Sequence, residues 1–127
     1  MRFELLDVWK RASRLSCEIY KLADKVNNWG FKDQITRSGL SVPSNIAEGE
    51  ERDTTKEKIS FLYYAKGSLG ELVTQLYIGV EAGFLDKKAS LILVNEAKEL
   101  AKIIGTMIKN KQSKIENDRN LRTEPRV

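Results

Sequence analysis

The side chains that come nearest to catalytic chemistry in this sequence are two glutamates, Glu48 and Glu71. A pair of carboxylates can act as general acid and general base, and Arg37, Arg52 and Lys66 are cations that could balance their charge. The chain contains no histidine, the side chain most often used for proton transfer near neutral pH and the commonest transition-metal ligand. No nucleophile, metal partner or glycine-rich phosphate loop accompanies the glutamates. The sequence therefore predicts a protein that is not an enzyme and uses no metal, no other cofactor and no small-molecule substrate.

A line of polar residues marks the segment from 34 to 52. On a helical projection one line holds Gln34, Arg37, Ser41, Ser44, Glu48 and Arg52. A solvated helix does not need so narrow an alignment, and this favours a buried or inter-subunit polar network. Lys66 falls within the apolar arc of its own predicted helix, where a cation is costly unless it is paired. We predict a structural network that sets helix register or subunit geometry, built from Gln34, Arg37, Glu48, Arg52, Lys66 and Glu71.

Apolar residues recur at steps of three and four along most of the chain, which is typical of amphipathic helices. The first seam consists of Leu5, Val8, Ala12, Leu15, Ile19, Leu22 and Val26. Further helices are predicted from Phe31 to about Arg52, from the cap residue Thr54 to about Ala82, and from Asp86 to about Lys111. Because short connections favour antiparallel neighbours, the sequence predicts an all-α fold, an up-down-up-down antiparallel four-helix bundle over residues 1–111.

Pro43 lies inside the second predicted helix. Proline has no amide hydrogen and its ring presses on the carbonyl four residues back, here that of Gly39, so we expect a kink near Pro43. A full break is the alternative. Beyond the bundle, residues 112–127 mix both charge signs with few apolar side chains, which predicts a polar, disordered tail.

The bulk composition restricts the class of protein only loosely. The 127 residues carry a net charge of +4, which admits nucleic acid as a partner but is shared by many ordinary proteins. Cys17 is the only cysteine and cannot form an internal bridge, and no long uninterrupted apolar run is present. The sequence predicts a cytoplasmic protein that does not enter a membrane.

Small residues inside the predicted helices indicate close packing. They are Ser38, Gly39, Gly67, Gly70 and Gly79. A glycine inside a helix costs up to about 1 kcal/mol relative to alanine. We therefore expect the helix backbones to approach one another closely at these positions.

A second seam on the first helix suggests self-association. It consists of Leu6, Trp9, Ser13, Cys17 and Tyr20, at spacings of three and four, and is rotated away from the core seam. A single bundle has only one interior, and aligned aromatic residues beside small ones are typical of a subunit contact. Scattered exposure of apolar side chains is the alternative. The sequence predicts a homo-oligomer that uses this seam as its interface.

Two stripes of cations lie on the outer helices: Lys10, Arg14, Lys21 and Lys25 on the first, and Lys87, Lys98, Lys102 and Lys109 on the fourth. The first and fourth helices of a simple bundle are neighbours, so these stripes are expected to merge into one basic surface. Lysines that neutralise phosphates give salt-dependent binding of RNA or DNA with little sequence preference. The alternative is a solvated face, interrupted by Glu18 and Glu99.

Several of these residues together carry a resemblance to a known family. On the second and third helices they are Gln34, Arg37, Asn45-Ile46-Ala47-Glu48-Gly49, Arg52, Phe61-Leu62, Ala65-Lys66-Gly67-Ser68 and Glu71-Leu72. On the first helix they are Leu6-Asp7-Val8-Trp9, Ala12, Leu15, Ile19 and Tyr20. Up to about residue 110 the chain resembles the 23S rRNA intervening-sequence proteins, and its NIAEG and GS-x-x-EL elements are specific.

The resemblance implies a helical bundle that assembles into a homopentamer, has no known enzymatic activity and has a commonly supposed role with RNA. It also adds Asn45 to the predicted polar network. We predict a non-enzymatic oligomeric protein that associates with nucleic acid through its basic outer surface. The alternative is an oligomeric scaffold that binds a protein partner and no nucleic acid.

Overall fold

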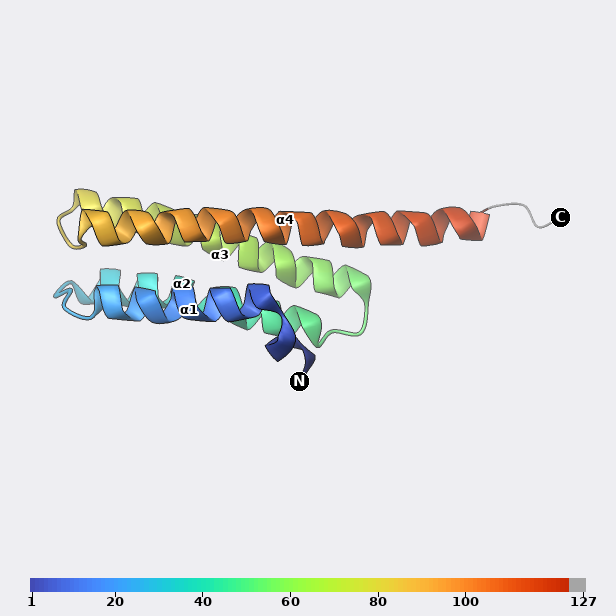
Figure 1. Ribbon diagram of the computed structural model, residues 1–127, viewed down its shortest axis with the longest axis horizontal. Coiled ribbons are helices and arrows are strands. Elements are labelled where there is room, and N and C mark those ends of the chain that lie inside the picture. The colour runs from blue at the N-terminus through green and yellow to red at the C-terminus, as the bar shows by residue number, and fades with distance from the viewer. Residues whose placement is uncertain (124–127) are drawn as a thin grey trace.

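The computed structural model describes residues 1–123, and every regular element in this range is helical (Figure 1). A short 3₁₀ turn, η1 (Arg2–Leu5), precedes four α-helices, which are α1 (Asp7–Ala23), α2 (Trp29–Glu50), α3 (Thr55–Glu81) and α4 (Lys87–Thr123). The predicted all-α fold with four packed helices is confirmed.

The helices pack in a closed order around one core. Each of α1 and α3 packs against both α2 and α4, and the loops that join successive helices lie at alternating ends of the molecule (Figure 1). Among the buried apolar side chains are Ala12, Leu15 and Ile19 of α1, Ile35, Val42 and Ile46 of α2, Leu69, Leu72 and Leu76 of α3, and Ala97, Leu100 and Ile104 of α4. Leu5, the first member of the predicted seam, is instead exposed, because Leu6 has an extended backbone and separates η1 from α1.

Local capping interactions explain where three of the helices begin. The Asn28 side chain accepts a hydrogen bond from the Phe31 amide at 3.0 Å, and the Thr54 hydroxyl accepts one from the Glu57 amide at 3.2 Å. The Asp86 carboxylate likewise accepts one from the Ala89 amide at 2.8 Å. Each bond satisfies an amide that has no partner inside its own helix.

Pro43 is buried within α2, which continues without interruption on both sides of it. The full break that the sequence left open is therefore excluded, while the kink stays a prediction. Side chains around the proline donate to carbonyls of the same helix: Ser41 to Ser38 at 2.8 Å, Ser44 to Leu40 at 2.9 Å, and Asn45 to Ser41 at 2.9 Å. These bonds go to carbonyls beside the proline, whereas the carbonyl that loses its amide donor to Pro43 is that of Gly39.

The glycines divide into close-packed and open positions. A Cβ at Gly39 would lie 3.4 Å from the Ile19 side chain, and one at Gly79 would lie 2.5 Å from Leu85 and 2.6 Å from Phe31. At Gly67 and Gly70 nothing lies within 4 Å of the Cβ position. Close packing therefore explains the small residues at 39 and 79, but the expectation of close contact is wrong at 67 and 70 within this chain.

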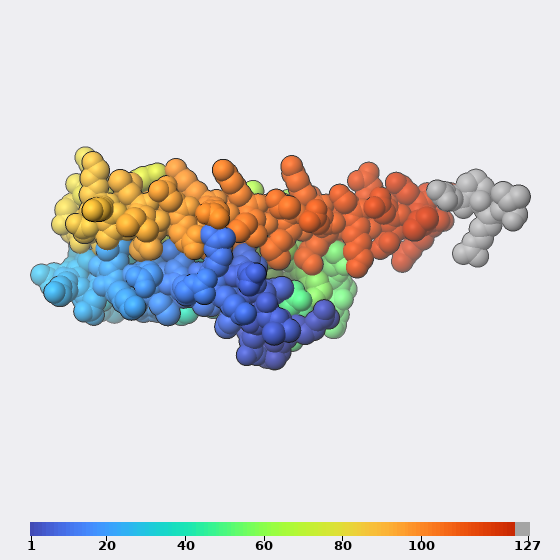
Figure 2. All heavy atoms as spheres, viewed as in Figure 1, coloured from blue at the N-terminus to red at the C-terminus, as the bar shows by residue number. Residues whose placement is uncertain are grey.

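The fourth helix is longer than predicted. It continues past Lys111 to Thr123 and projects beyond the other helices (Figures 1 and 2). The disordered tail predicted for residues 112–127 is therefore helical as far as Thr123, and residues 124–127 lie outside the described range. In the described part of the chain, no helix is both long and apolar enough to span a membrane.

Candidate functional site

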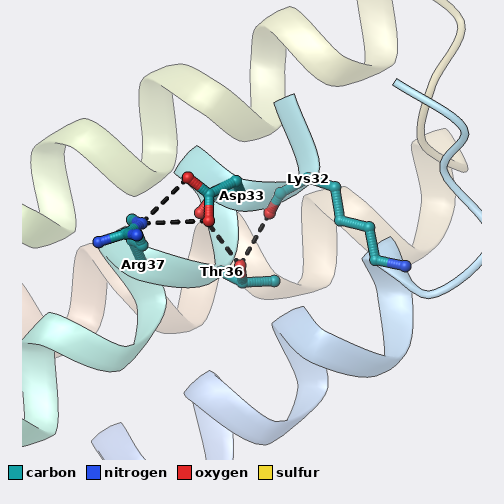
Figure 3. Close-up of polar contacts among 4 residues, drawn as sticks. All are labelled: Lys32, Asp33, Thr36 and Arg37. Carbon is teal, nitrogen blue, oxygen red and sulfur yellow. Dashed lines mark hydrogen bonds and ion pairs between the residues drawn. The ribbon is translucent and has the colours of Figure 1, made fainter. Parts of the chain in front are cut away.

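Two charged members of the predicted polar network on α2, Arg37 and Glu48, pair with residues four positions away along the chain. Arg37 turns along its own helix and donates to both Asp33 carboxylate oxygens, at 3.1 and 3.0 Å (Figure 3). Glu48 pairs with Arg52 at 2.5 Å, again one helical turn apart. Arg52 also lies over the Phe61 ring, with its guanidinium carbon 4.7 Å from the ring centre. These arrangements hold α2 together and join it to α3.

The uncharged polar residues of α2 also bond locally. Thr36 donates to the carbonyl oxygens of Lys32 and Asp33, at 2.8 and 3.1 Å (Figure 3). Asn45 and the serines near Pro43 bond carbonyls one turn back. Short polar side chains readily make such bonds, so an aligned polar row does not require an outside partner.

The remaining network residues lie on two different faces of α3. Glu71 is exposed and lines a shallow hollow of about 340 Å³ between α2 and α3, together with Gln34, Arg37, Ser38, Ser41 and Ser68. Lys66 is exposed on the other side of α3, beside Gly105 of α4. Within residues 1–123 of one chain, Glu48, Arg37, Lys66 and Glu71 therefore do not form the predicted network. An inter-subunit version of it stays a prediction.

The outer seam of α1 is only partly free. Leu6 and Trp9 are half-buried and pack against the core, and Phe3 of η1 stacks edge-on against Trp9 with ring centres 5.2 Å apart. Ser13 is half-buried, whereas Cys17 and Tyr20 are exposed. At the first turn of α1 the apolar flank is partly covered by η1, and the use of this seam as a subunit interface stays a prediction.

The surface shared by α1 and α4 carries charges of both signs. These helices lie side by side on the face shown in Figure 2. Arg11 of α1 bonds the Glu96 carboxylate of α4 and lies 3.1 Å from Glu99, while Glu18 lies 3.4 Å from Lys21. The bond to Glu96, followed by that to Glu99, raises the pKa of Arg11 above its usual high value. The two predicted cation stripes are thus separated by acids here and do not merge.

Two lysines of the predicted α4 stripe, Lys102 and Lys109, instead belong to a groove between α3 and α4, together with Lys66 of α3. Its hollow has a volume of about 640 Å³ and is lined by Tyr63, Lys66, Ala101, Lys102, Gly105, Thr106, Ile108, Lys109 and Gln112. We call this surface the α3/α4 groove. The Tyr63 hydroxyl accepts a hydrogen bond from the Gln112 side chain at 3.2 Å. Farther along the same helix pair, the Lys98 ammonium lies 5.7 Å from the centre of the Tyr77 ring.

The α3/α4 groove has the chemistry of an anion-binding surface. Among the described residues, no acidic side chain lines its hollow, so the charges of Lys66, Lys102 and Lys109 are not offset there. Half-exposed tyrosines beside such lysines are typical of surfaces that bind nucleic-acid strands. The sequence contained a signal for this face, because Tyr63, Lys66, Gly70, Thr74 and Tyr77 follow one another at steps of three and four.

Comparison with known proteins gives a family and a fold. The sequence profile of the family described as 23S rRNA-intervening sequence protein matches residues 4–106. Among solved structures, a protein with unknown function from the S23 ribosomal protein family of Bacteroides thetaiotaomicron VPI-5482 matches with a TM-score of 0.75 and 24% sequence identity. The match covers 80% of this chain and 98% of that chain, and it supports the fold alone. None of the curated proteins matches.

Proposed function

Because this chain belongs to the 23S rRNA-intervening sequence protein family, we propose that it is a cytoplasmic, non-enzymatic protein that associates with nucleic acid. The contact is made through phosphates of the nucleic acid and lysines of the α3/α4 groove. The protein acts as a homo-oligomer, so that each groove is repeated around the assembly.

The single observation that carries the proposal is the uncompensated charge of the α3/α4 groove. Lys66 comes from α3, and Lys102 and Lys109 come from α4, yet all three line one hollow, and within residues 1–123 no acidic side chain lines it. Each lysine that neutralises a phosphate releases a counterion, and this release favours binding at low salt. On the α1 side, by contrast, Glu96 and Glu99 already pair with Arg11, which makes that face a poorer partner for phosphates.

A non-enzymatic role is supported by the separation of the two candidate carboxylates. Glu48 of α2 is paired with Arg52, whereas Glu71 of α3 lines a hollow beside Gln34 that Glu48 does not line. Acid and base catalysis needs both groups within hydrogen-bond reach of one substrate. Within residues 1–123 of a single chain, these positions of Glu48 and Glu71 do not meet this condition.

The proposal is tested by measuring RNA binding of two variants, each of which lacks three cations: one in the α3/α4 groove and one on α1. The groove variant carries Lys66→Gln, Lys102→Gln and Lys109→Gln, and the matched control on α1 carries Lys10→Gln, Arg14→Gln and Lys21→Gln. Fluorescence anisotropy with a labelled RNA at several salt concentrations gives the slope of log affinity against log salt. If three phosphate contacts are lost, the slope should fall by about 2 for a single strand. The control should keep its slope, and an equal effect of both triple variants would contradict the assignment to the groove.

A scaffold that binds another protein is the second candidate. Tyr64 and Ile78 on α3 are 59% and 54% exposed, and exposed apolar side chains of this size favour a protein contact. Light scattering at two salt concentrations, with and without RNA, separates these possibilities. A complex whose mass and affinity are indifferent to salt would support the scaffold.

A further inference from the structure

We infer that the α3/α4 groove takes single-stranded nucleic acid, with a base stacked on Tyr63 and the sugar-phosphate backbone laid across Gly70 and Gly105. This inference rests on the proposed function and adds the form of nucleic acid that the groove selects. The aromatic rings, the glycines and the size of the groove support it.

Two tyrosine rings stand on the same face of α3 as Lys66. Tyr63 is 49% exposed and Tyr77 is 45% exposed. They are fourteen positions apart in the sequence, which corresponds to about 21 Å along the helix axis. The bond from Gln112 holds the Tyr63 hydroxyl at the edge of the hollow. Half-exposed aromatic rings between lysines form the surface on which successive unpaired bases stack in single-strand binding proteins.

Two glycines lie along this surface: Gly105 lines the hollow, and Gly70 follows Lys66 by one helical turn on the same face of α3. Nothing lies within 4 Å of a Cβ at Gly70, and at Gly105 the only neighbour within that distance is the Lys66 ammonium, at 3.8 Å. A glycine inside a helix costs up to about 1 kcal/mol, and no packing within this chain offsets that loss at Gly70. A glycine allows a ligand backbone to approach the helix closely. A strand that continues from the hollow along this face of α3 passes Gly70, which explains a glycine there that packing within the chain does not explain.

The dimensions of the hollow favour a single strand over a duplex. Its volume of about 640 Å³ is large enough for one unpaired base, and the hollow is open to solvent along the α3/α4 surface. In an RNA duplex the bases are paired and stacked inside the helix, so none is free to lie against Tyr63. A duplex could touch only the lysine ammonium groups at the rim. A single strand can place phosphates on Lys102 and Lys109 while an unpaired base enters the hollow.

The test compares one RNA strand with a duplex that carries the same number of phosphates. Fluorescence anisotropy with labelled oligouridine and with the duplex is measured for the full chain and for Tyr63→Ala. The variant should lose about tenfold in affinity for oligouridine, as expected when one stacked base is lost, and little for the duplex. Tyr63→Phe keeps the ring and should bind as the native chain does. Tyr64→Ala removes a more exposed ring that packs on Phe61 outside the groove and serves as the matched control.

A second variant tests whether the strand passes over Gly70. Gly70→Leu places a side chain in space that is open in the folded chain, so the bundle should fold normally by circular dichroism. The leucine would occupy the path of the strand and should reduce the affinity for oligouridine at least as much as Tyr63→Ala. Unchanged affinity of this folded variant would overturn the inference.

The outcomes distinguish this inference from the proposed function. If the native chain binds neither RNA at low salt, both fail. If it binds the duplex as tightly as the single strand, or if Tyr63→Ala and Tyr64→Ala behave alike, the inference fails and the proposed function stands. If Tyr63→Ala loses affinity together with a change in oligomer mass by light scattering, the ring belongs to a protein interface and the inference also fails.

Discussion

Replacing Gly79 by alanine should destabilise the protein, whereas the same change at Gly70 should stabilise it. Both glycines lie inside α3, so the helix gains the same intrinsic propensity from either substitution. The difference lies in their surroundings. A Cβ at Gly70 meets nothing within 4 Å, but one at Gly79 would lie 2.5 Å from Leu85 Cδ1 and 2.6 Å from Phe31 Cζ.

The magnitudes follow from these distances. At Gly70 only the propensity gain acts, which is up to about 1 kcal/mol in the free energy of unfolding. At Gly79 the new methyl group must displace Leu85, which is buried, and Phe31, which packs against the core. Overpacking of this kind costs about 2 to 3 kcal/mol, against the same gain of about 1 kcal/mol. The two variants should therefore differ by about 2 to 3 kcal/mol, or roughly 10 °C in melting temperature.

Urea denaturation followed by circular dichroism measures the difference directly. The slope m should be unchanged in both variants, so the shift of the midpoint reports stability. Measurements at two protein concentrations separate the folding of one chain from subunit dissociation. Equal midpoints for the two variants would refute the packing argument. A lower midpoint for Gly70→Ala that depends on concentration would place Gly70 in a subunit contact.

Two further predictions concern α4. Arg11→Met should lower the free energy of unfolding by about 0.5 to 1 kcal/mol, because it removes the ion pairs that join α1 to Glu96 and Glu99, and this loss should shrink in high salt. Since the bond to Glu96 raises the pKa of Arg11, the stabilisation from this ion pair is complete at every pH below the pKa of an unfolded arginine, so urea midpoints measured in ordinary alkaline buffers should not change through loss of its charge. Truncation after Ser113 should reduce the helical circular dichroism signal but change the unfolding free energy by less than about 0.5 kcal/mol, because none of the described side chains beyond Ser113 is buried; a larger loss would show that the projecting turns pack on the bundle.

The helices could be predicted from the sequence because their seams and caps are local signals. Thr54 and Asp86 cap α3 and α4 as expected from their types and positions. The predicted end of α4, near Lys111, was wrong for a physical reason. A low apolar content indicated disorder, but the segment is rich in good helix formers and places Asp118 four residues before Arg122, which favours a helix.

The polar network was wrong within one chain because helical projection cannot tell a local partner from a distant one. Arg37 and Glu48 both have an oppositely charged residue one turn away, and each pairs with it. Lys66 and Glu71 are five positions apart, a spacing that carries them to different sides of α3. Their separation follows from the same geometry that aligned the residues of α2.

The position of the basic groove depends on the handedness of the bundle. The apolar seams of the helices do not determine this handedness. The residues that directly follow core positions of α4, such as Lys98 after Ala97 and Lys109 after Ile108, lie toward α3. Glu96, which directly precedes Ala97, lies toward α1. A bundle of opposite handedness would exchange these neighbours and bring the α4 lysines beside α1, as the merged stripe requires. The sequence places the lysines on the correct helix, while tertiary packing decides which helix they meet.

Gly70 of α3 allows the effect of a substitution on stability to be compared with its effect on strand binding. A helix selected for stability alone would have alanine at Gly70, where a methyl group meets no other atom. Gly79 cannot be changed in this way, because Leu85 and Phe31 already fill the space. If Gly70→Ala stabilises the bundle and a larger side chain there weakens the binding of single strands, the native glycine lowers the stability of α3 in order to keep this face open to the strand. Gain of stability with no change in binding would instead leave that glycine without a role in the groove.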